Sequence, residues 1–105
     1  MEYFIYLDRL ARREAVENAF LSSLQTENLT VAYTDMKAGA EIPLHHHAEE
    51  AVDILLEGIL EMQIGEGTGT VTTGMITIVP SGIPHKATAV TDCKVVTIFY
   101  PQRKL

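Results

Sequence analysis

The sequence predicts an all-β domain, either a sandwich or a barrel, with a short helical turn near its N-terminus. From residue 18 onward, apolar residues alternate with polar ones or form short runs rich in Val, Ile, Thr and Tyr, a pattern typical of strands. Glycine, proline and Asn or Asp residues separate these runs at short intervals, as they do at tight turns. The helical signal is confined to residues 8–20, which are rich in good helix formers.

The predicted elements begin with the helical turn. Asp8 can cap it, and Leu10 and Glu14 stand at helical spacing, but the apolar positions repeat too irregularly for more than about two turns. Glycines and prolines between the later segments supply the backbone conformations at which strands reverse. The predicted strands lie at residues 19–24, 29–36, 41–46, 51–56, 59–64, 69–72, 75–79, 86–89 and 94–100.

Length and composition indicate one domain and restrict its partners. The 105 residues contain no linker-like or low-complexity stretch, so we expect residues 1–105 to form a single domain. A formal net charge of −6 opposes binding to nucleic acid or to an anionic membrane surface. The first residues lack the pattern of a signal peptide and no long apolar stretch follows them, so we expect a cytoplasmic protein. Cys93 is the only cysteine, which excludes an intrachain disulfide and is compatible with a reducing compartment.

The composition also predicts self-association. Hydrophobic residues make up 47% of the chain, a high share for a small domain whose surface must remain mostly polar. A buried face between two copies explains this excess, and an edge strand at residues 3–7 would be able to pair across it. We therefore expect a homodimer.

Four histidines lie in two β segments that are bounded by turns. Side chains alternate between the two faces of a strand, so His45 and His47 share one face, with Cα atoms about 6 to 7 Å apart, while His46 faces the other way. His85 is the available third histidine and follows a rigid turn of proline and glycine. Neutral imidazole is the commonest ligand for transition metals, so these three residues are a candidate metal site; the alternative is a solvated strand end.

The arrangement of these histidines among glycines resembles the two motifs of the cupin family. The matching residues are Gly39, His45, His47 and Gly58 in the first motif, and Gly74, Pro80, Gly82 and His85 in the second. The resemblance covers residues 29–100 approximately. It implies a cupin double-stranded β-helix, a jelly-roll-like barrel, in which His45, His47 and His85 bind a divalent transition metal. The ligands do not distinguish zinc, iron, manganese and nickel.

Two positions depart from the family pattern. Ala51 stands where the family places a Glu or Gln ligand, and Glu50, one residue earlier, should face the opposite side of the sheet. Asp53 lies two residues after Ala51, on the same face of the strand, and is predicted to face the interior. There it would be a further ligand, an acid/base group or a hydrogen-bond hub. The alternative for Asp53 is an outward position in a salt bridge. Ala89 replaces the asparagine that ends the second motif.

The chain is also similar to the small bacterial cupins of pectin and alginate degradation, which convert unsaturated uronates to open-chain keto sugars. Phe99 and Arg103 match the ending of that group, and the match implies that Arg103 binds a substrate carboxylate at the mouth of the barrel. Thr97 stands where that group carries its catalytic aspartate, and Asp53 is the residue that could restore this acid/base group. Met62 and Phe99 are interpreted as lining a substrate pocket or packing in the core.

Three functions remain open from the sequence. The first is a metal-dependent enzyme that acts on a small anionic or carbonyl-bearing substrate, sugar-like or uronate-like, by Lewis-acid polarisation, with Asp53 and Arg103 as catalytic residues. The second is a non-haem iron dioxygenase, for which three histidine ligands suffice. The third is a non-enzymatic module that binds or senses a small molecule such as a sugar.

Overall fold

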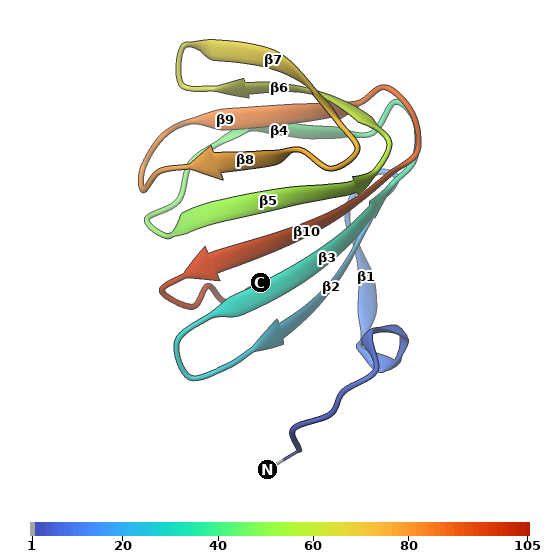
Figure 1. Cartoon of the computed structure of the whole chain (residues 1–105), viewed down its shortest axis with the longest axis vertical. Coiled ribbons are helices and arrows are strands. Elements are labelled where there is room, and N and C mark those ends of the chain that lie inside the picture. Colours follow the sequence, from blue (N-terminus) through green and yellow to red (C-terminus); the bar gives the residue numbers. More distant parts are fainter. Residues whose placement is uncertain (1) are drawn as a thin grey trace.

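The computed structural model describes residues 2–105, and in this range the chain forms ten strands and one helical turn (Figure 1). The helical turn is η1 (Leu7–Arg9), a single turn of 3-10 helix. The strands are β1 (Arg12–Val16), β2 (Ala19–Gln25), β3 (Thr30–Met36), β4 (Glu41–His45), β5 (Glu50–Glu57), β6 (Ile59–Ile64), β7 (Gly67–Thr72), β8 (Ile76–Val79), β9 (His85–Ala89) and β10 (Cys93–Tyr100). None of the described residues belongs to a helix long and apolar enough to cross a membrane.

The strands form two antiparallel sheets. The larger sheet has the order β1-β2-β3-β10-β5-β8, and the smaller has the order β4-β9-β6-β7. From β3 to β10 the chain passes repeatedly from one sheet to the other, so strands distant in sequence become neighbours, as β3 and β10 do in Figure 1. This connectivity is that of a jelly roll, with β1 and β2 added at one edge of the larger sheet. The predicted all-β, jelly-roll-like barrel with a short N-terminal helical turn is confirmed.

The core lies between the two sheets. Along β10, Cys93 and Val95 are buried while Lys94 is exposed, because successive side chains of a strand point to opposite faces. The same alternation in the other strands gives a main buried cluster that joins Leu55 of β5 to Leu60 of β6, and so ties the larger sheet to the smaller one. The inward-facing residues beside this cluster enclose the candidate site.

The N-terminal part of the chain differs from the prediction. Among residues 2–105 the helix is the single turn Leu7–Arg9, at the start of the stretch 8–20 in which one or two turns were predicted, and Arg12–Val16 in the same stretch pairs with β2 as an edge strand instead. The side chains of β1 are almost all exposed, so the segment lacks the apolar alternation that marks a strand in a sequence. Pairing with β2 outweighs its local helix propensity. Residues 3–6 form no strand, so the edge strand predicted at residues 3–7 is wrong.

Gly58 forms the tight turn between β5 and β6. Its φ of +112° lies in a region that glycine adopts readily and that other residues avoid. A Cβ atom at this position would collide with the carbonyl oxygen of Asp92 and with Sγ of Cys93. The glycine that ends the first motif is therefore required by two things at once: the backbone conformation of its turn and the close packing of the segment that leads into β10.

Candidate metal centre and cavity

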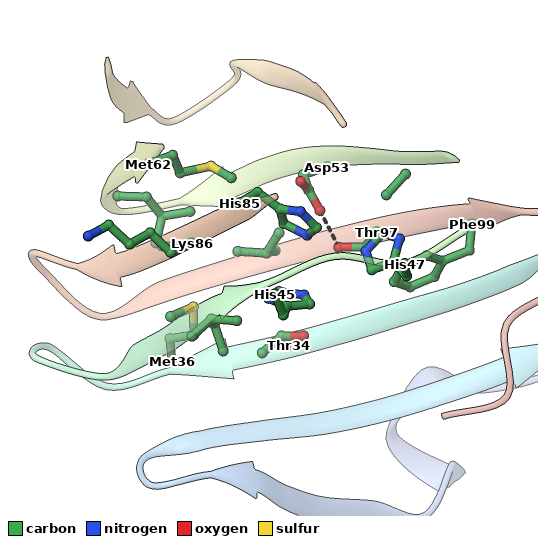
Figure 2. Close-up of a pocket in the computed structure, with 15 residues that line it drawn as sticks. Thr34, Met36, His45, His47, Asp53, Met62, His85, Lys86, Thr97 and Phe99 are labelled. Carbon is green, nitrogen blue, oxygen red and sulfur yellow. Dashed lines mark hydrogen bonds between the residues drawn. The ribbon is translucent and has the colours of Figure 1, made fainter. Parts of the chain in front are cut away.

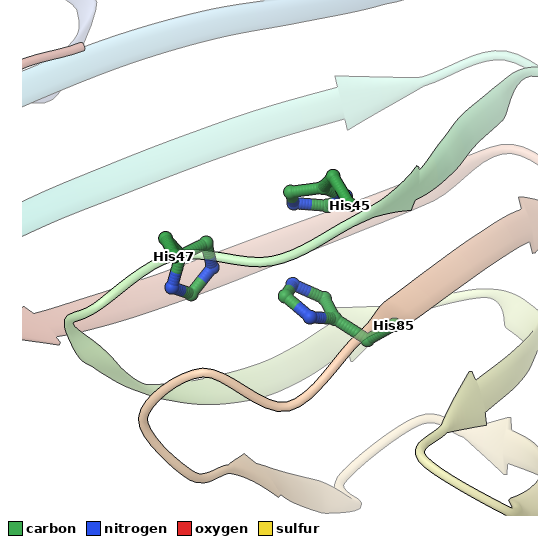
Figure 3. Close-up of side chains that lie close together, drawn as sticks. All are labelled: His45, His47 and His85. Atoms are coloured by element: carbon green, nitrogen blue, oxygen red, sulfur yellow. The ribbon is translucent and has the colours of Figure 1, made fainter.

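Three histidine side chains converge between the sheets (Figure 3). His45 is the last residue of β4 and is the register partner of His85, the first residue of β9. His47 lies two residues further along, in the loop that leads to β5. The ring centroids are 4.1 Å apart for His45 and His85, 4.8 Å for His47 and His85, and 5.6 Å for His45 and His47. One ring nitrogen of each histidine lies within 4.8 Å of those of the other two.

Each of the three rings is oriented in the same way, by a backbone carbonyl at Nδ1. The carbonyl partners are those of Pro43 for His45 (2.8 Å), Glu49 for His47 (2.8 Å) and Ile83 for His85 (2.9 Å). A carbonyl oxygen can only accept, so Nδ1 carries the proton and donates it, which leaves the lone pair of Nε2 free. A free Nε2 is what a histidine ligand needs, and a hydrogen bond from the other ring nitrogen is its usual support.

The turn before β9 fixes the backbone of His47. Gly82 adopts a φ of +77°, and its N–H donates to the carbonyl oxygen of His47 at 2.8 Å. His45 is half-buried and His47 is buried, whereas His46 between them is exposed, which confirms the predicted alternation of the triplet. His85 is buried as well. Burial lowers the pKa of His85 below its usual 6.5, and the neighbouring His45 and His47 lower this pKa further. The His85 ring therefore stays neutral, as a ligand must, to a lower pH than a free histidine.

The histidines line a cavity of about 160 Å³ between the sheets (Figure 2). Its walls come from β3, β4, β5, β6, β9 and β10, and more than half of the lining residues are apolar. The polar residues of the lining, apart from the histidines, are Thr34, Asp53, Lys86 and Thr97. Pockets for drug-sized molecules measure about 300–1,000 Å³, so this cavity suits a smaller ligand.

Asp53 lies in the cavity wall between two threonines. It is the register partner of Thr97 on β10 and of Thr77 on β8. The hydroxyl of Thr97 donates to Oδ1 of Asp53 at 2.6 Å, and the hydroxyl of Thr77 donates to Oδ2 at 3.1 Å. Figure 2 shows the bond from Thr97. Asp53 thus faces the interior, as its parity predicts, and both of its carboxylate oxygens are held by neighbouring strands.

Ala51 leaves the metal centre without a carboxylate from β5. Its side chain is buried and lines the cavity, whereas Glu50 is exposed. Among residues 2–105, no other histidine, cysteine, aspartate or glutamate joins the three histidines within ligand reach. The donor set is therefore three neutral nitrogens. It fits a divalent transition metal: two nitrogens bound at about 2.0–2.1 Å to one ion stand roughly 3–4 Å apart, and one ring nitrogen of each histidine lies within 4.8 Å of those of the other two.

Two of the residues predicted to contact substrate line the cavity. The ring of Phe99 lies edge-on to that of His47, with centroids 5.4 Å apart and planes at 77°. Phe99 also packs in the core, where it is only 8% exposed. Met62 enters from the smaller sheet, and its Sδ lies 3.8 Å from the hydroxyl oxygen of Thr77. Phe99 and Met62 thus flank the polar groups from opposite sheets.

Arg103 lies outside the cavity lining and is engaged by a residue that the sequence did not single out. Its Nη1 is 3.0 Å from Oε1 of Glu49, and its Cζ is 5.9 Å from the centre of the Phe99 ring. A hydrogen bond from its own backbone N–H lowers the pKa of Glu49 below the usual value, and Arg103 lowers this pKa further. The only sequence signal for Glu49 is its position two residues after His47.

Comparison with known proteins agrees with this geometry. The family profile described as the cupin domain matches residues 32–99, which is more than half of the chain. A curated relative, an uncharacterized protein of Streptomyces coelicolor, is 31% identical over 97 residues, which cover 90% of this chain and 92% of the relative.

Solved structures share the fold at low identity. KdgF from a Halomonas species superposes with a TM-score of 0.90 at 18% identity, covering 99% of this chain and 97% of that one. Oxalate decarboxylase of Bacillus subtilis, in a study of its Mn(II) centres, superposes with a TM-score of 0.85 at 20% identity, covering 92% of this chain and 29% of that one. Likenesses at this level of identity establish the fold of the chain.

Proposed function

The chain belongs to the cupin family, and from that premise we propose that it is a metal-dependent enzyme acting on a small anionic or carbonyl-bearing substrate, sugar-like or uronate-like. One observation carries the proposal. Three imidazole rings line one cavity, and in each of them Nδ1 is hydrogen-bonded to a backbone carbonyl oxygen. All three Nε2 atoms are therefore free to bind a single ion. A solvated strand end would not require three rings to be fixed in this common way.

The ion would be held by His45, His47 and His85. A bound divalent ion supplies Lewis-acid polarisation of a carbonyl or hydroxyl oxygen of the substrate. Three neutral ligands neither neutralise its charge nor fill its coordination positions, which favours an anionic substrate. Zinc, iron, manganese and nickel all accept this donor set, and the Mn(II) centres of the Bacillus subtilis oxalate decarboxylase support manganese as one of the metals to test.

Asp53 is the proposed acid/base residue. It is the only carboxylate among the residues that line the cavity, and Thr77 and Thr97 hold its two oxygens in place. Each carboxylate oxygen keeps a second lone pair, so Asp53 is able to accept a proton at one substrate position and return it at another. Such proton transfer suits an isomerisation or the opening of a sugar ring, in which no redox step is needed.

Phe99 and Met62 are the proposed substrate contacts. Both present apolar surface to the cavity from opposite sheets, and they exclude water from the space beside Asp53 and the histidines. Where water is excluded, each polar interaction between the substrate and these groups becomes stronger. The small cavity volume restricts the substrate, or the part of it that enters, to a few heavy atoms in contact with the site.

Metal analysis of protein purified without a histidine tag tests the proposal. We expect one divalent ion per chain. His45→Ala, His47→Ala and His85→Ala should each lower the metal affinity by more than the roughly 10–100-fold that follows the loss of a group that only hydrogen-bonds a ligand. His46→Ala is the matched control, because its side chain is exposed and it should retain the ion. A loss in His46→Ala as large as in His45→Ala and His47→Ala, with none in His85→Ala, would place the ion on a solvated triplet and contradict the proposal.

A substrate screen by NMR tests the catalytic part. Metal-loaded protein should convert unsaturated uronates or related small keto sugars, and Asp53→Asn should lower kcat by about 10²–10⁴ while the metal affinity stays unchanged. Oxygen consumption by the iron-loaded protein would instead favour a dioxygenase. Tight binding of a sugar without turnover would favour a binding module, and either result would contradict the proposed reaction.

A further inference from the structure

The C-terminal tail is fastened to the β2–β3 turn before it reaches the site. Thr30 is fully buried, and its Oγ1 accepts from the N–H of Arg103 and donates to the carbonyl oxygen of Arg103, both at 2.8 Å. The side chain of Gln25 also donates to that carbonyl, at 2.8 Å. The side chain of Gln102 donates to two carbonyl groups of the turn, at 2.8 and 2.9 Å. The backbone of Arg103 is therefore held at a defined place.

From this anchor the side chain of Arg103 reaches the loop between β4 and β5. The guanidinium lies beside the ring of Phe99 and ends in the ion pair with Glu49, with 3.0 Å between Nη1 and Oε1. The side chains of Arg103 and Glu49 are only 31% and 20% exposed, so water screens this pair less than an ordinary surface pair. The two residues are 54 positions apart in sequence.

Glu49 connects this ion pair to the metal centre through its own backbone. Its carbonyl oxygen is the acceptor for Nδ1 of His47, at 2.8 Å. Moving the Glu49 backbone would release the bond that selects the Nε2-free tautomer of His47 and sets the direction of its ring. The loop residues 46–49 lie outside the strands, so the strand ladder does not itself hold this carbonyl in place.

We propose that Arg103 is a positioning residue for His47: through the carboxylate of Glu49, the anchored C-terminal tail holds the carbonyl that orients the His47 ring. The edge-on contact between Phe99 and His47, with Arg103 beside Phe99, is a second link between Arg103 and the His47 ring. The inference rests on the proposed metal site but concerns the His47 ring itself.

The ring can be followed without metal, by ¹⁵N NMR of the histidine side chains in chelator-treated protein at a pH where they are neutral. The unmodified chain should show His47 with its proton on Nδ1. Arg103→Ala and Glu49→Ala should give His47 a mixture of tautomers, while the signals of His45 and His85 stay in place. Arg103→Lys should recover part of the effect, and Lys104→Ala, on the exposed neighbouring residue, should have none.

Metal affinity supplies the second readout, by competition with a chelator for Ni²⁺. Loss of a supporting group costs roughly 10–100-fold in metal affinity, so we expect about this loss for Arg103→Ala. In the His47→Ala background, Arg103→Ala should cause no further loss of metal affinity, because the two residues are coupled. In the His45→Ala background, Arg103→Ala should cause its full loss, because the effects of uncoupled residues add.

The outcomes separate the two proposals. If Arg103→Ala leaves both the His47 tautomer and the Ni²⁺ affinity unchanged, or costs as much affinity in the His47→Ala background as in the unmodified chain, the positioning role is overturned. If the unmodified chain binds no metal but Arg103→Ala still disorders the His47 ring, the proposed function fails while the positioning role stands.

Discussion

The hydroxyl of Thr97 donates a hydrogen bond of 2.6 Å to Oδ1 of Asp53, its register partner on the neighbouring strand. In the uronate-linearising cupins that the chain resembles, the position of Thr97 carries an aspartate. The carboxylate of this chain thus stands one strand away from that position, on the same cavity wall. Residues paired directly across two strands have Cβ atoms about 4.5–5.5 Å apart, so a carboxylate at either position reaches the same part of the cavity.

Thr97→Val should therefore destabilise the protein. The substitution keeps the side-chain volume but leaves Oδ1 of Asp53 without its hydroxyl donor, and we expect a loss of about 1 to 2 kcal/mol in the free energy of unfolding, measured with urea. Thr70→Val is the matched control, because the hydroxyl of Thr70 donates at 2.9 Å to Glu61 on the exposed surface. The control should change the free energy of unfolding by less than about 0.5 kcal/mol. Equal effects would mean that the bond to Asp53 is as weak as a surface bond.

The sequence was sufficient to predict the parts of the molecule that depend on local periodicity. The nine predicted strands are present as β2 to β10, with ends displaced by at most two residues. Period-two alternation also placed His45, His47 and Asp53 on inward faces and His46 outside. These predictions hold because the buried face of a strand sets both its apolar pattern and the direction of its side chains.

The features that the sequence could not reveal depend on contacts between distant segments. Arg12–Val16 is a strand because it pairs with β2, although its side chains are exposed and carry no strand pattern. Glu49 supports His47 and binds Arg103, but its partner lies 54 residues away and no spacing rule connects them. The pairing of β1 and the position of the C-terminal tail are set by the whole fold. The strand at Arg12–Val16 and the contact between Glu49 and Arg103 therefore follow only from the structure.

Metal binding should raise the stability of the folded protein. An ion that binds only the folded state adds about 2.7 kcal/mol at a free concentration of 100 times its Kd. We expect an increase in Tm on addition of the metal, reversal by a chelator, and no increase in His85→Ala. His46→Ala should respond as the unmodified chain does. A metal-dependent rise in Tm that survives in His85→Ala would mean that the ion binds elsewhere.

Acidification should destabilise the metal-free protein through His85. Its pKa in the folded state lies below the usual 6.5, because burial disfavours the charged ring, whereas the unfolded chain takes up the proton at the usual value. Below that value the unfolded state binds more protons than the folded state, so the free energy of unfolding falls as the pH decreases. Above it both states are neutral and His85 makes no difference. Urea unfolding between about pH 7.5 and 5.5 measures the effect.

His85→Gln is the variant that isolates this contribution. It should flatten the decline of stability over the same pH range, because a glutamine cannot be protonated there. His46→Gln, at an exposed position, should leave the decline unchanged. The low pKa of the Glu49 carboxyl makes its own contribution at more acidic pH, below the usual 4.5, so the two effects are separable. An identical pH dependence in both variants would contradict the assignment to His85.

Gly58→Ala should be strongly destabilising. The alanine would have to adopt a φ of +112°, and its Cβ atom would collide with Asp92 and Cys93. Strained backbone costs about 1–3 kcal/mol and overpacking a further 1–3 kcal/mol, so we expect a loss of at least about 2 kcal/mol in the free energy of unfolding. Gly69→Ala is the control, since Gly69 has no positive φ and a Cβ there meets nothing within 4 Å. Similar stability of the two variants would show that the turn relaxes.

The homodimer expected from the composition remains a prediction, and the outer face of the larger sheet is the surface on which to test it. Two adjacent cross-strand rows on that face are made of aliphatic residues and one tyrosine: Val31, Ile98, Val52 and Ile78 in one row, and Tyr33, Val96, Ile54 and Ile76 in the next. Ile76 and Ile78 are 59% and 61% exposed in the single chain. A two-fold axis through such a face would lay it against its own copy, which is the commonest arrangement in homodimers.

A charge placed on this surface, at Ile78 of the edge strand β8, should separate the copies. Ile78→Lys would bury an unpaired ammonium group in a dimer but would leave a monomer undisturbed, because the side chain is already exposed. We expect light scattering at micromolar concentration to give a dimer for the unmodified chain and a monomer for Ile78→Lys, with unchanged circular dichroism. Val90→Lys, at a position 50% exposed in the turn before β10, should stay dimeric. A monomeric unmodified chain would rule out the dimer, and a dimeric Ile78→Lys would move its interface to another face.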